Sequence, residues 1–384
     1  MKHKKEVFIA ALIIVFLIAI GPSIKKQVGI YTKGKNIDKS YSKDSLYDIY
    51  ITNGEGLGLI QISNIEKGNI NYSKIDNINV KYDSANFLFI ENDSGGKIYV
   101  PYSSDIENPK NANRLLIFNE GKLEDEIEFD DIRNPQTVIS DRENNRIFLE
   151  QNITVQHEDS QGLKLKVIDT NSKEVIKELY LKGYIRDYYV GEKEIVLSLE
   201  GAKKLGFLDA QDRSLYAINR ETLEGRVISK EPICNVVNAL CGDSKGNNVI
   251  FTNITLKESG DLNKNEIIVM DSHGEIKERK EIPYDMNGSF YGNEKYEYVL
   301  NGKIHNKNNG FLIFNKETLE FEKLVDDVKD ISYIESLDGY LFILTRDSKI
   351  FIYDENTLEQ IGSIELGWEV SHRMKVINRK VKLS

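Results

Sequence analysis

Short stretches of alternating apolar and polar residues follow one another from residue 46 to residue 377, separated by clusters of Gly, Asn, Asp and Ser. Alternation with a period of two places every second side chain on the same face of a strand. No long segment after residue 45 has the period of an amphipathic helix. The pattern therefore predicts an all-β domain built from many short strands.

One hairpin unit recurs along this region, and its fullest copies are IFNKETLEFEKL (Ile313–Leu324), IYDENTLEQIGSI (Ile352–Ile364) and AINRETLEGRVI (Ala217–Ile228). An apolar strand ends at Asp or Asn, whose side chain can bond the backbone two residues on and start a turn. A second strand with charged residues follows, as expected for an outer edge strand. The predicted turn positions are Ser63, Asn119, Asp169, Asn219, Asp271, Asn315 and Asp354.

Each hairpin follows another apolar strand and a short first strand, which makes four strands per unit. Seven such units, spaced by 39 residues (Asn315 to Asp354) to 56 residues (Ser63 to Asn119), predict a seven-bladed β-propeller. The stretch DRENNRIFLEQN…LKLKVIDTNSKEVIKELYL (Asp141–Leu181) resembles the YVTN-type, or lactonase-like, seven-bladed propeller repeats. The resemblance implies the fold. It also implies, as an alternative function, a lactonase-like or lyase-like hydrolytic site in the central channel.

The two ends of the propeller predict how the ring closes. The N-terminal unit supplies only three strands, at Leu46–Thr52, Gly58–Ser63 and Ile70–Ile75. The C-terminus supplies a spare alternating strand, Trp368–Ile377. We therefore expect this last strand to become the inner strand of the first blade, in a 1+3 clasp.

The N-terminal residues 1–26 have the pattern of a signal-anchor. Lysines precede the unbroken apolar run Val7–Ile20, and the apolar character continues to Ile24 except at Gly21, Pro22 and Ser23. This is close to the length that a membrane-spanning helix needs. Pro22 follows the best cleavage site for signal peptidase and disfavours cleavage there, so a retained anchor is favoured over a cleaved signal peptide or a buried core helix.

The remaining chain divides into a polar tether, residues 27–45, and the propeller, residues 46–384. Because an N-terminal signal-anchor commonly directs export, we expect a single-pass cell-membrane protein whose propeller lies outside the cytoplasm. The alternative is a protein secreted after signal cleavage.

Composition restricts the function classes. The formal net charge of −10 argues against a nucleic-acid partner, since phosphate binding needs a basic face. Two cysteines cannot form a disulfide framework or a four-cysteine zinc site, and only five histidines occur. We expect neither a metal nor another cofactor, and the sequence offers no catalytic constellation.

Long polar loops are expected between the second and third strands of five blades, which places them on one rim. Loops on a rigid scaffold commonly carry binding sites, so a protein or glycan partner is expected on this rim. The loops are Ser103–Ala112, Gln151–Gly162, Glu200–Asp212, Asn253–Asn265 and Gly302–Asn309.

Two groups of candidate binding residues follow. Tyr184, Arg186, Tyr188 and Tyr189 lie on a predicted inner strand, where they would line the central channel or take part in ordinary blade packing. The other group, His157, Glu158 and Asp159, would supply a base or metal ligands, or would form an exposed acidic loop. The favoured function is a membrane-anchored binding or scaffold module, and the alternative is the propeller enzyme described above.

Overall fold

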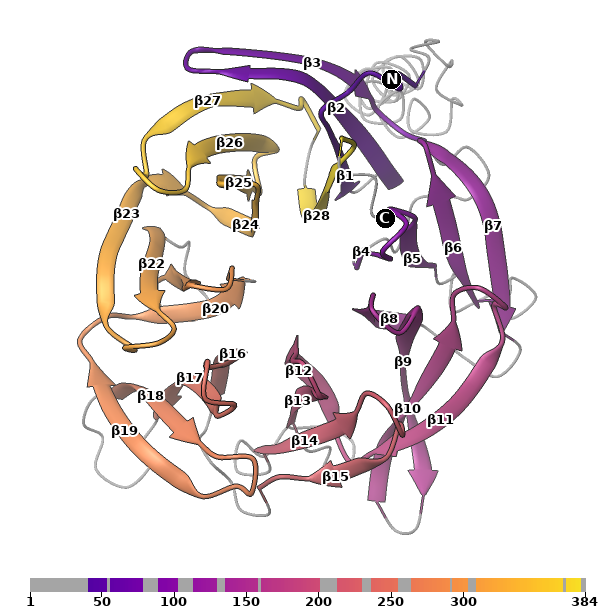
Figure 1. The fold of residues 1–384 in the computed structure, drawn as a ribbon, viewed down its shortest axis with the longest axis vertical. Helices are drawn as coiled ribbons and strands as arrows, with labels where there is room; N and C mark the ends of the chain where they lie inside the picture. Colours follow the sequence, from indigo (N-terminus) through magenta and orange to yellow (C-terminus); the bar gives the residue numbers. More distant parts are fainter. Residues whose placement is uncertain are drawn as a thin grey trace, which may run out of the picture. The chain divides into compact units, whose positions relative to one another are not determined.

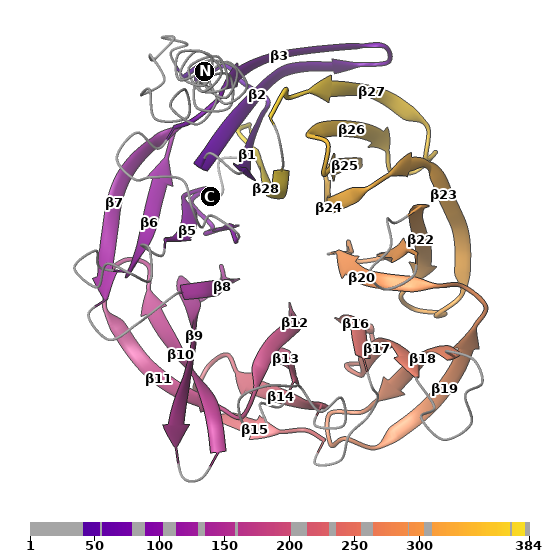
Figure 2. The same cartoon turned by 180° about the vertical axis from the view of Figure 1, so that it is seen from behind.

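A computed structural model gives the fold of the chain (Figures 1 and 2). It describes residues 41–380 except 54–55, 79–88, 103–112, 130–134, 158–159, 201–212, 230–235, 255–263, 291, 303–308 and 369–370. Seven four-stranded antiparallel sheets surround a common axis, which confirms the predicted all-β seven-bladed propeller. Among these residues no helix is long and apolar enough to span a membrane. The predicted anchor, Val7–Ile24, lies outside the described residues.

The strands alternate regularly, four to a blade, from the inner to the outer edge. Blades 1 to 4 consist of β28 (Ser371–Asn378), β1 (Tyr47–Asn53), β2 (Gly56–Glu66) and β3 (Asn69–Ile75); β4 (Glu91–Asn92), β5 (Ile98–Tyr102), β6 (Asn113–Asn119) and β7 (Lys122–Phe129); β8 (Pro135–Asp141), β9 (Arg146–His157), β10 (Ser160–Asp169) and β11 (Val175–Leu181); and β12 (Tyr184–Val190), β13 (Glu194–Glu200), β14 (Arg213–Asn219) and β15 (Gly225–Val227). Blades 5 to 7 consist of β16 (Val236–Gly242), β17 (Asn248–Ile254), β18 (Lys264–Met270) and β19 (Ile276–Ile282); β20 (Met286–Phe290), β21 (Tyr296–Asn301), β22 (Asn309–Asn315) and β23 (Phe321–Lys329); and β24 (Ile331–Leu337), β25 (Tyr340–Thr345), β26 (Lys349–Asp354) and β27 (Gln360–Glu365).

This topology gives the molecule two unlike rims. The connections between second and third strands lie on one rim, which we call the loop rim. The turns between first and second strands, and between third and fourth strands, lie on the other, which we call the turn rim. Both faces of each blade pack against a neighbour, so the core consists of apolar layers between blades. Between blades 7 and 1, for example, Ile49, Ile51, Phe342 and Met374 are fully buried in one cluster.

The C-terminal strand closes the ring as predicted. Strand β28 pairs antiparallel with β1, with Ile49 opposite Val376 and Ile51 opposite Met374. The predicted start of this strand was wrong, because β28 begins at Ser371 and not at Trp368. Trp368 lies before the strand, packs over Gly58, where a Cβ would lie 2.3 Å from the indole ring, and donates a hydrogen bond to Asp76 at 3.1 Å.

A second contact closes the ring on its outside. The β2–β3 hairpin reaches over blade 7, where Gly68 N–H donates to the carbonyl of Ile361 at 2.8 Å and Lys67 pairs with Glu359 at 2.6 Å (Figure 1). The predicted turn at Ser63 was wrong, since β2 continues to Glu66. A β-bulge between Ile62 and Asn64 interrupts the alternation there, so the strand seems to end early in the sequence.

The other predicted turn positions are confirmed with one exception. The side-chain Oδ1 of Asn219 accepts hydrogen bonds from the backbone N–H groups of Glu221 (2.9 Å) and Thr222 (2.8 Å). The same kind of turn forms at Asp169, Asp271, Asn315 and Asp354. At Asn119 the chain uses a two-residue turn instead, in which Glu120 and Gly121 have φ of 47° and 70°.

One predicted loop is a strand pair. The sequence predicts a polar loop at Gln151–Gly162, but β9 continues to His157 and β10 begins at Ser160, with Gly162 opposite Val155. Strand β8 pairs with β9 only as far as Gln151, and β11 pairs with β10 only from Leu163. Beyond these limits, β9 and β10 therefore form a two-stranded arm on the loop rim, which projects from the ring in Figure 1.

Candidate functional site in the central channel

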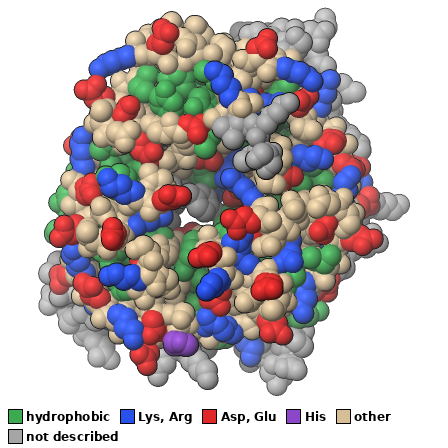
Figure 3. Space-filling model, in the orientation of Figure 1, with side chains coloured by type: hydrophobic (Ala, Val, Ile, Leu, Met, Phe, Trp, Pro, Cys, Tyr) green, Lys and Arg blue, Asp and Glu red, His purple; other side chains and the backbone are tan. Residues whose placement is uncertain are grey.

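The inner strands of the blades surround a central opening. Figure 3 shows this opening at the middle of the molecule, with acidic and basic side chains around it. Because the inner strands come from all parts of the chain, side chains distant in sequence meet here.

Lys375 on β28 is the centre of a buried charge cluster. Its Nζ lies 3.0 Å from Glu91 on β4 and 3.4 Å from Glu335 on β24. The two carboxylates come from the blades on either side of blade 1. The three side chains are only 8, 9 and 12% exposed, so the ion pairs are shielded from water. A single ammonium group thus joins blades 7, 1 and 2.

Tyr188 extends this cluster to a fourth blade. From β12 in blade 4, its hydroxyl donates to Glu91 at 2.9 Å, and it lies 3.2 Å from the carbonyl of Val138 on β8. The other carboxylate, Glu335, accepts a hydrogen bond from the backbone N–H of Val376 at 2.8 Å. Each carboxylate therefore has both a cationic and a neutral donor.

The electrostatics of the cluster follow from burial and from its charge balance. Burial lowers the pKa of Lys375, but Glu335 and Glu91 outweigh it and the net pKa is raised. Burial also raises the pKa of Glu335, opposed by Lys375 and by Arg142 after β8. Lys375 is therefore charged at all physiological pH values, which makes it a permanent link and a poor proton donor.

An arginine occupies the channel wall nearer the loop rim. The guanidinium of Arg373 on β28 lies 5.2 Å from the ring centroid of Phe89 and 5.3 Å from that of Tyr333. Such cation–π contacts favour a fixed orientation of the guanidinium. The inner wall of blade 1 therefore carries two positioned cations, Arg373 and Lys375.

This arrangement is suited to joining blades. The charges of Lys375, Glu91 and Glu335 are directed at one another, and no nucleophile–base pair is formed among them. Within the described part of the chain, no group of three His, Cys, Asp or Glu side chains is arranged to hold a metal ion.

The residues predicted on the inner strand are on β12, but they point in different directions. Tyr188 reaches Glu91, as described above. Tyr189 points toward blade 5 and donates to Oδ1 of Asn248 at 2.8 Å. Tyr184 packs in the apolar layer between blades 3 and 4, and Arg186 is exposed. The four side chains therefore do not form a single site.

The second predicted group lies on the arm. His157 is the last residue of β9, while Glu158 and Asp159 lie outside the described residues. So do most of the other long loops, at 103–112, 201–212, 255–263 and 303–308. The arm is thus the part of the elaborated loop rim whose backbone the structure describes.

Sequence reasoning missed the residues that meet in the channel. Lys375, Glu91 and Glu335 lie on inner strands in three different blades, and the hairpin repeat does not include them. The available signal was a charged residue at an otherwise apolar inner strand, as in IENDS around Glu91 and YIESL around Glu335. That signal does not tell which charges face one another.

Comparison with known proteins supports the fold. No protein-family model and no curated protein matches the sequence. Among solved structures, apo AztD from Citrobacter koseri aligns over 87% of this chain and 98% of its own, with TM-score 0.51 and 11% identity. The dihydro-heme d1 dehydrogenase NirN, in complex with DHE, aligns over 90% of this chain and 78% of its own, with TM-score 0.52 and 13% identity. At such low identity these similarities show the propeller fold alone.

Proposed function

We propose that this chain is a membrane-attached binding or scaffold module whose propeller lies outside the cytoplasm and binds a protein or glycan partner on its loop rim. The observation that carries this proposal is the β9–β10 arm. Strand pairing beyond Gln151 and Leu163 serves no blade of the ring. An element that leaves the scaffold in this way is available for binding, as loops and hairpins on rigid folds often are.

The channel supports the same conclusion from the other side. Its best-formed cluster, around Lys375, is neutralised by its own carboxylates and holds four blades together. The attachment to the membrane rests on the N-terminal sequence, in which basic residues flank the apolar segment Val7–Ile24.

The test is to shorten the arm and follow partner binding. In the variant, a two-residue Asn-Gly turn replaces residues 153–162, so that the blade keeps its ladder with β8 and β11. We expect the melting temperature to change little, since loop length costs little stability. Co-purification of a partner from detergent-solubilised membranes, and binding to a glycan array, should both be compared with the parent chain. Binding lost in the variant supports the proposal.

The matched controls lie on the turn rim. Charge reversals Glu221→Lys and Glu317→Lys alter two exposed turns of the opposite rim. They should leave binding intact. If these reversals abolish binding and the shortened arm does not, the loop rim is not the binding face.

A further inference from the structure

An apolar patch lies on the face shown in Figure 3, where blades 7 and 1 meet. Its centre is an edge-to-face pair of Tyr47 and Tyr340, with ring centroids 6.2 Å apart. Around this pair, partly exposed apolar side chains pack on the same core cluster. We define the rim patch as Leu46, Ile65, Ile70, Leu337, Tyr340 and Ile361.

The rim patch belongs to the turn rim. Leu337 and Tyr340 flank the β24–β25 turn, and Ile65 and Ile70 are opposite each other next to the β2–β3 turn. Contiguous exposed apolar surface with polar surroundings marks an interaction site more often than chance exposure does. The loop rim, with the arm, is on the other side of the molecule.

The chain enters the propeller directly beside this patch. Residues Tyr41–Ser45 precede Leu46, whose N–H donates to the carbonyl of Ile62 at 2.6 Å and whose carbonyl accepts from Arg379 N–H at 2.8 Å. Leu46 is therefore both the first residue of the patch and the end of the incoming segment.

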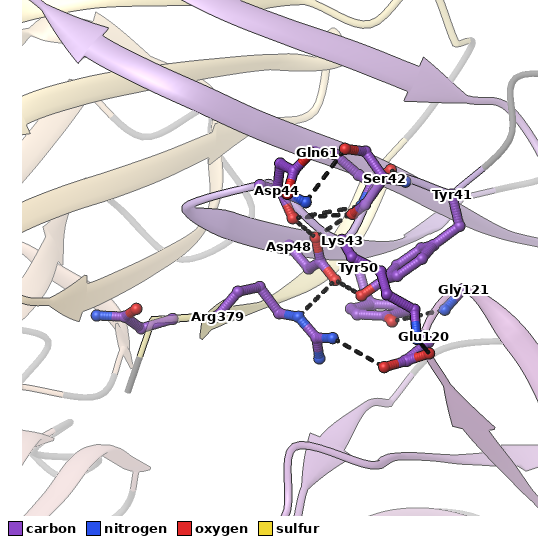
Figure 4. Close-up of polar contacts among 12 residues, drawn as sticks. Tyr41, Ser42, Lys43, Asp44, Asp48, Tyr50, Gln61, Glu120, Gly121 and Arg379 are labelled. Atoms are coloured by element: carbon purple, nitrogen blue, oxygen red, sulfur yellow. Dashed lines mark hydrogen bonds and ion pairs between the residues drawn. The ribbon is translucent and has the colours of Figure 1, made fainter. Parts of the chain in front are cut away.

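The incoming segment is held firmly by one buried carboxylate, Asp48 (Figure 4). Asp48 accepts hydrogen bonds from the hydroxyl of Tyr41 at 2.7 Å, the hydroxyl of Ser45 at 2.7 Å and the amide of Gln61 at 3.0 Å. The Nε of Arg379 lies 3.6 Å from the same carboxylate. These contacts fix the point at which residue 41 meets the propeller, beside the rim patch.

We propose that the rim patch rests on the surface of the lipid bilayer into which the N-terminal segment inserts. This inference rests on the proposed function, because it requires that the segment Val7–Ile24 be retained in a membrane. The residues from Lys25 to Ser40 form a link of 16 residues (40 − 24). A flexible chain of that length has an end-to-end distance of about 22 Å.

So short a link gives the patch a local concentration in the millimolar range with respect to the bilayer. A weak apolar contact is then enough to seat it. Leu, Ile and Tyr side chains suit the headgroup region, where a tyrosine keeps its hydroxyl in water and buries its ring.

The charges around the patch determine which lipid it needs. Exposed Lys43, Lys67 and Lys380 are balanced by exposed Asp44, Asp338 and Glu359. A balanced perimeter gains nothing from anionic lipid. We therefore expect docking on purely zwitterionic bilayers and little dependence on salt. With the turn rim on the membrane, the loop rim faces away from it and toward a partner.

The experiment uses the single native tryptophan as an internal control. Trp368 is the only tryptophan of the chain and lies at the β27–β28 link on the loop rim. The full chain and its Tyr340→Trp variant are reconstituted into phosphatidylcholine vesicles with and without brominated phosphatidylcholine. We expect the added fluorescence of the variant to be lost in brominated vesicles, while the fluorescence of the parent chain is unchanged.

A second probe and an extraction step complete the design. Leu337→Trp places a probe at the other side of the same turn and should be quenched as well, and a further Ile361→Asp change should relieve that quenching. If the chain resists alkaline carbonate extraction but neither probe is quenched, the rim patch does not contact lipid. If carbonate removes the chain from the vesicles, the proposed membrane attachment fails, and this inference fails with it.

Discussion

At the residue scale, two buried glutamates bear on pH-dependent stability. Glu150 on β9 is 3% exposed and accepts a hydrogen bond from the N–H of Ile185 at 3.2 Å. Burial raises its pKa to about 7, opposed by hydrogen bonds from Thr137 and Ile185. Glu297 on β21 also has a pKa raised to about 7 by burial, although Lys316 lies 3.3 Å away. Both carboxyl groups therefore favour the neutral form when the protein is folded.

The first prediction is that Glu150→Gln stabilises the protein at pH 8 and not at pH 4.5. Between about pH 4.5 and 7, the folded state keeps a proton that the unfolded chain has released, so the contribution of Glu150 to stability falls over this window. The full difference corresponds to about 3 kcal/mol. Thermal unfolding at the two pH values measures it. The variant keeps an acceptor for Ile185 N–H, so a gain at both pH values would contradict the argument.

Glu178 in the same blade supplies a control of opposite sign. It pairs with Lys164 at 2.8 Å and Lys166 at 3.2 Å, and these pairs outweigh burial and lower its pKa. Its contribution is present above its unfolded pKa and is lost as pH falls. Glu178→Gln should therefore destabilise the protein at pH 8 and have less effect in acid.

At the element scale, the hairpin turns differ in how they are stabilised. Asn219 and Asn119 are the same residue type at the same place in the repeat. The Oδ1 of Asn219 accepts two backbone N–H groups, whereas the turn after Asn119 is closed by the left-handed residues Glu120 and Gly121. The side chain is therefore part of the turn in one blade and not in the other.

The second prediction follows from that difference. Asn219→Ala removes the acceptor of two turn donors and should cost about 1 kcal/mol, as the loss of a comparable helix N-cap does. Asn119→Ala should cost less than about half of that. Thermal or urea unfolding of the two variants measures the contrast. Equal losses would mean that the side-chain bonds at Asn219 contribute nothing beyond the position itself.

Elements with an unbroken alternation could be predicted from the sequence. Strand β25 has the predicted bounds, Tyr340–Thr345, because a continuous apolar run is flanked by turn residues on both sides. Strand β2 was predicted too short, because the bulge after Ile62 shifts its alternation. The arm was predicted as a loop because Gln151–Gly162 is mostly polar, although Ile153 and Val155 alternate with polar residues there. The Lys375 cluster depends on which inner strands meet across the channel, and no local pattern contains that information.

At the scale of the whole molecule, the ends of the chain carry an unusual share of the contacts that hold the ring together. Strand β28 pairs with β1 over Tyr47–Asn53 and supplies Met374 and Val376 to the layer between blades 7 and 1. It also supplies Lys375, which joins three blades, while Arg379 holds the incoming segment through Asp48. Closing a ring of blades requires that both ends contribute to one blade, and here the same strand also neutralises the charges of its neighbours.

The third prediction concerns this closure. Deleting Trp368–Ser384 removes β28, leaves the inner edge of β1 unpaired and leaves Glu91 and Glu335 without their cation, so the cooperative thermal transition should be lost. Deleting only residues 381–384 keeps β28 and Arg379 and should leave the melting temperature unchanged. Lys375→Met keeps the strand but leaves two carboxylates buried without a charge partner, which should cost about 3–5 kcal/mol. Adding Glu335→Gln to that variant should restore part of the loss. A chain without β28 that melts cooperatively at the parent temperature would refute the role of this strand in closing the ring.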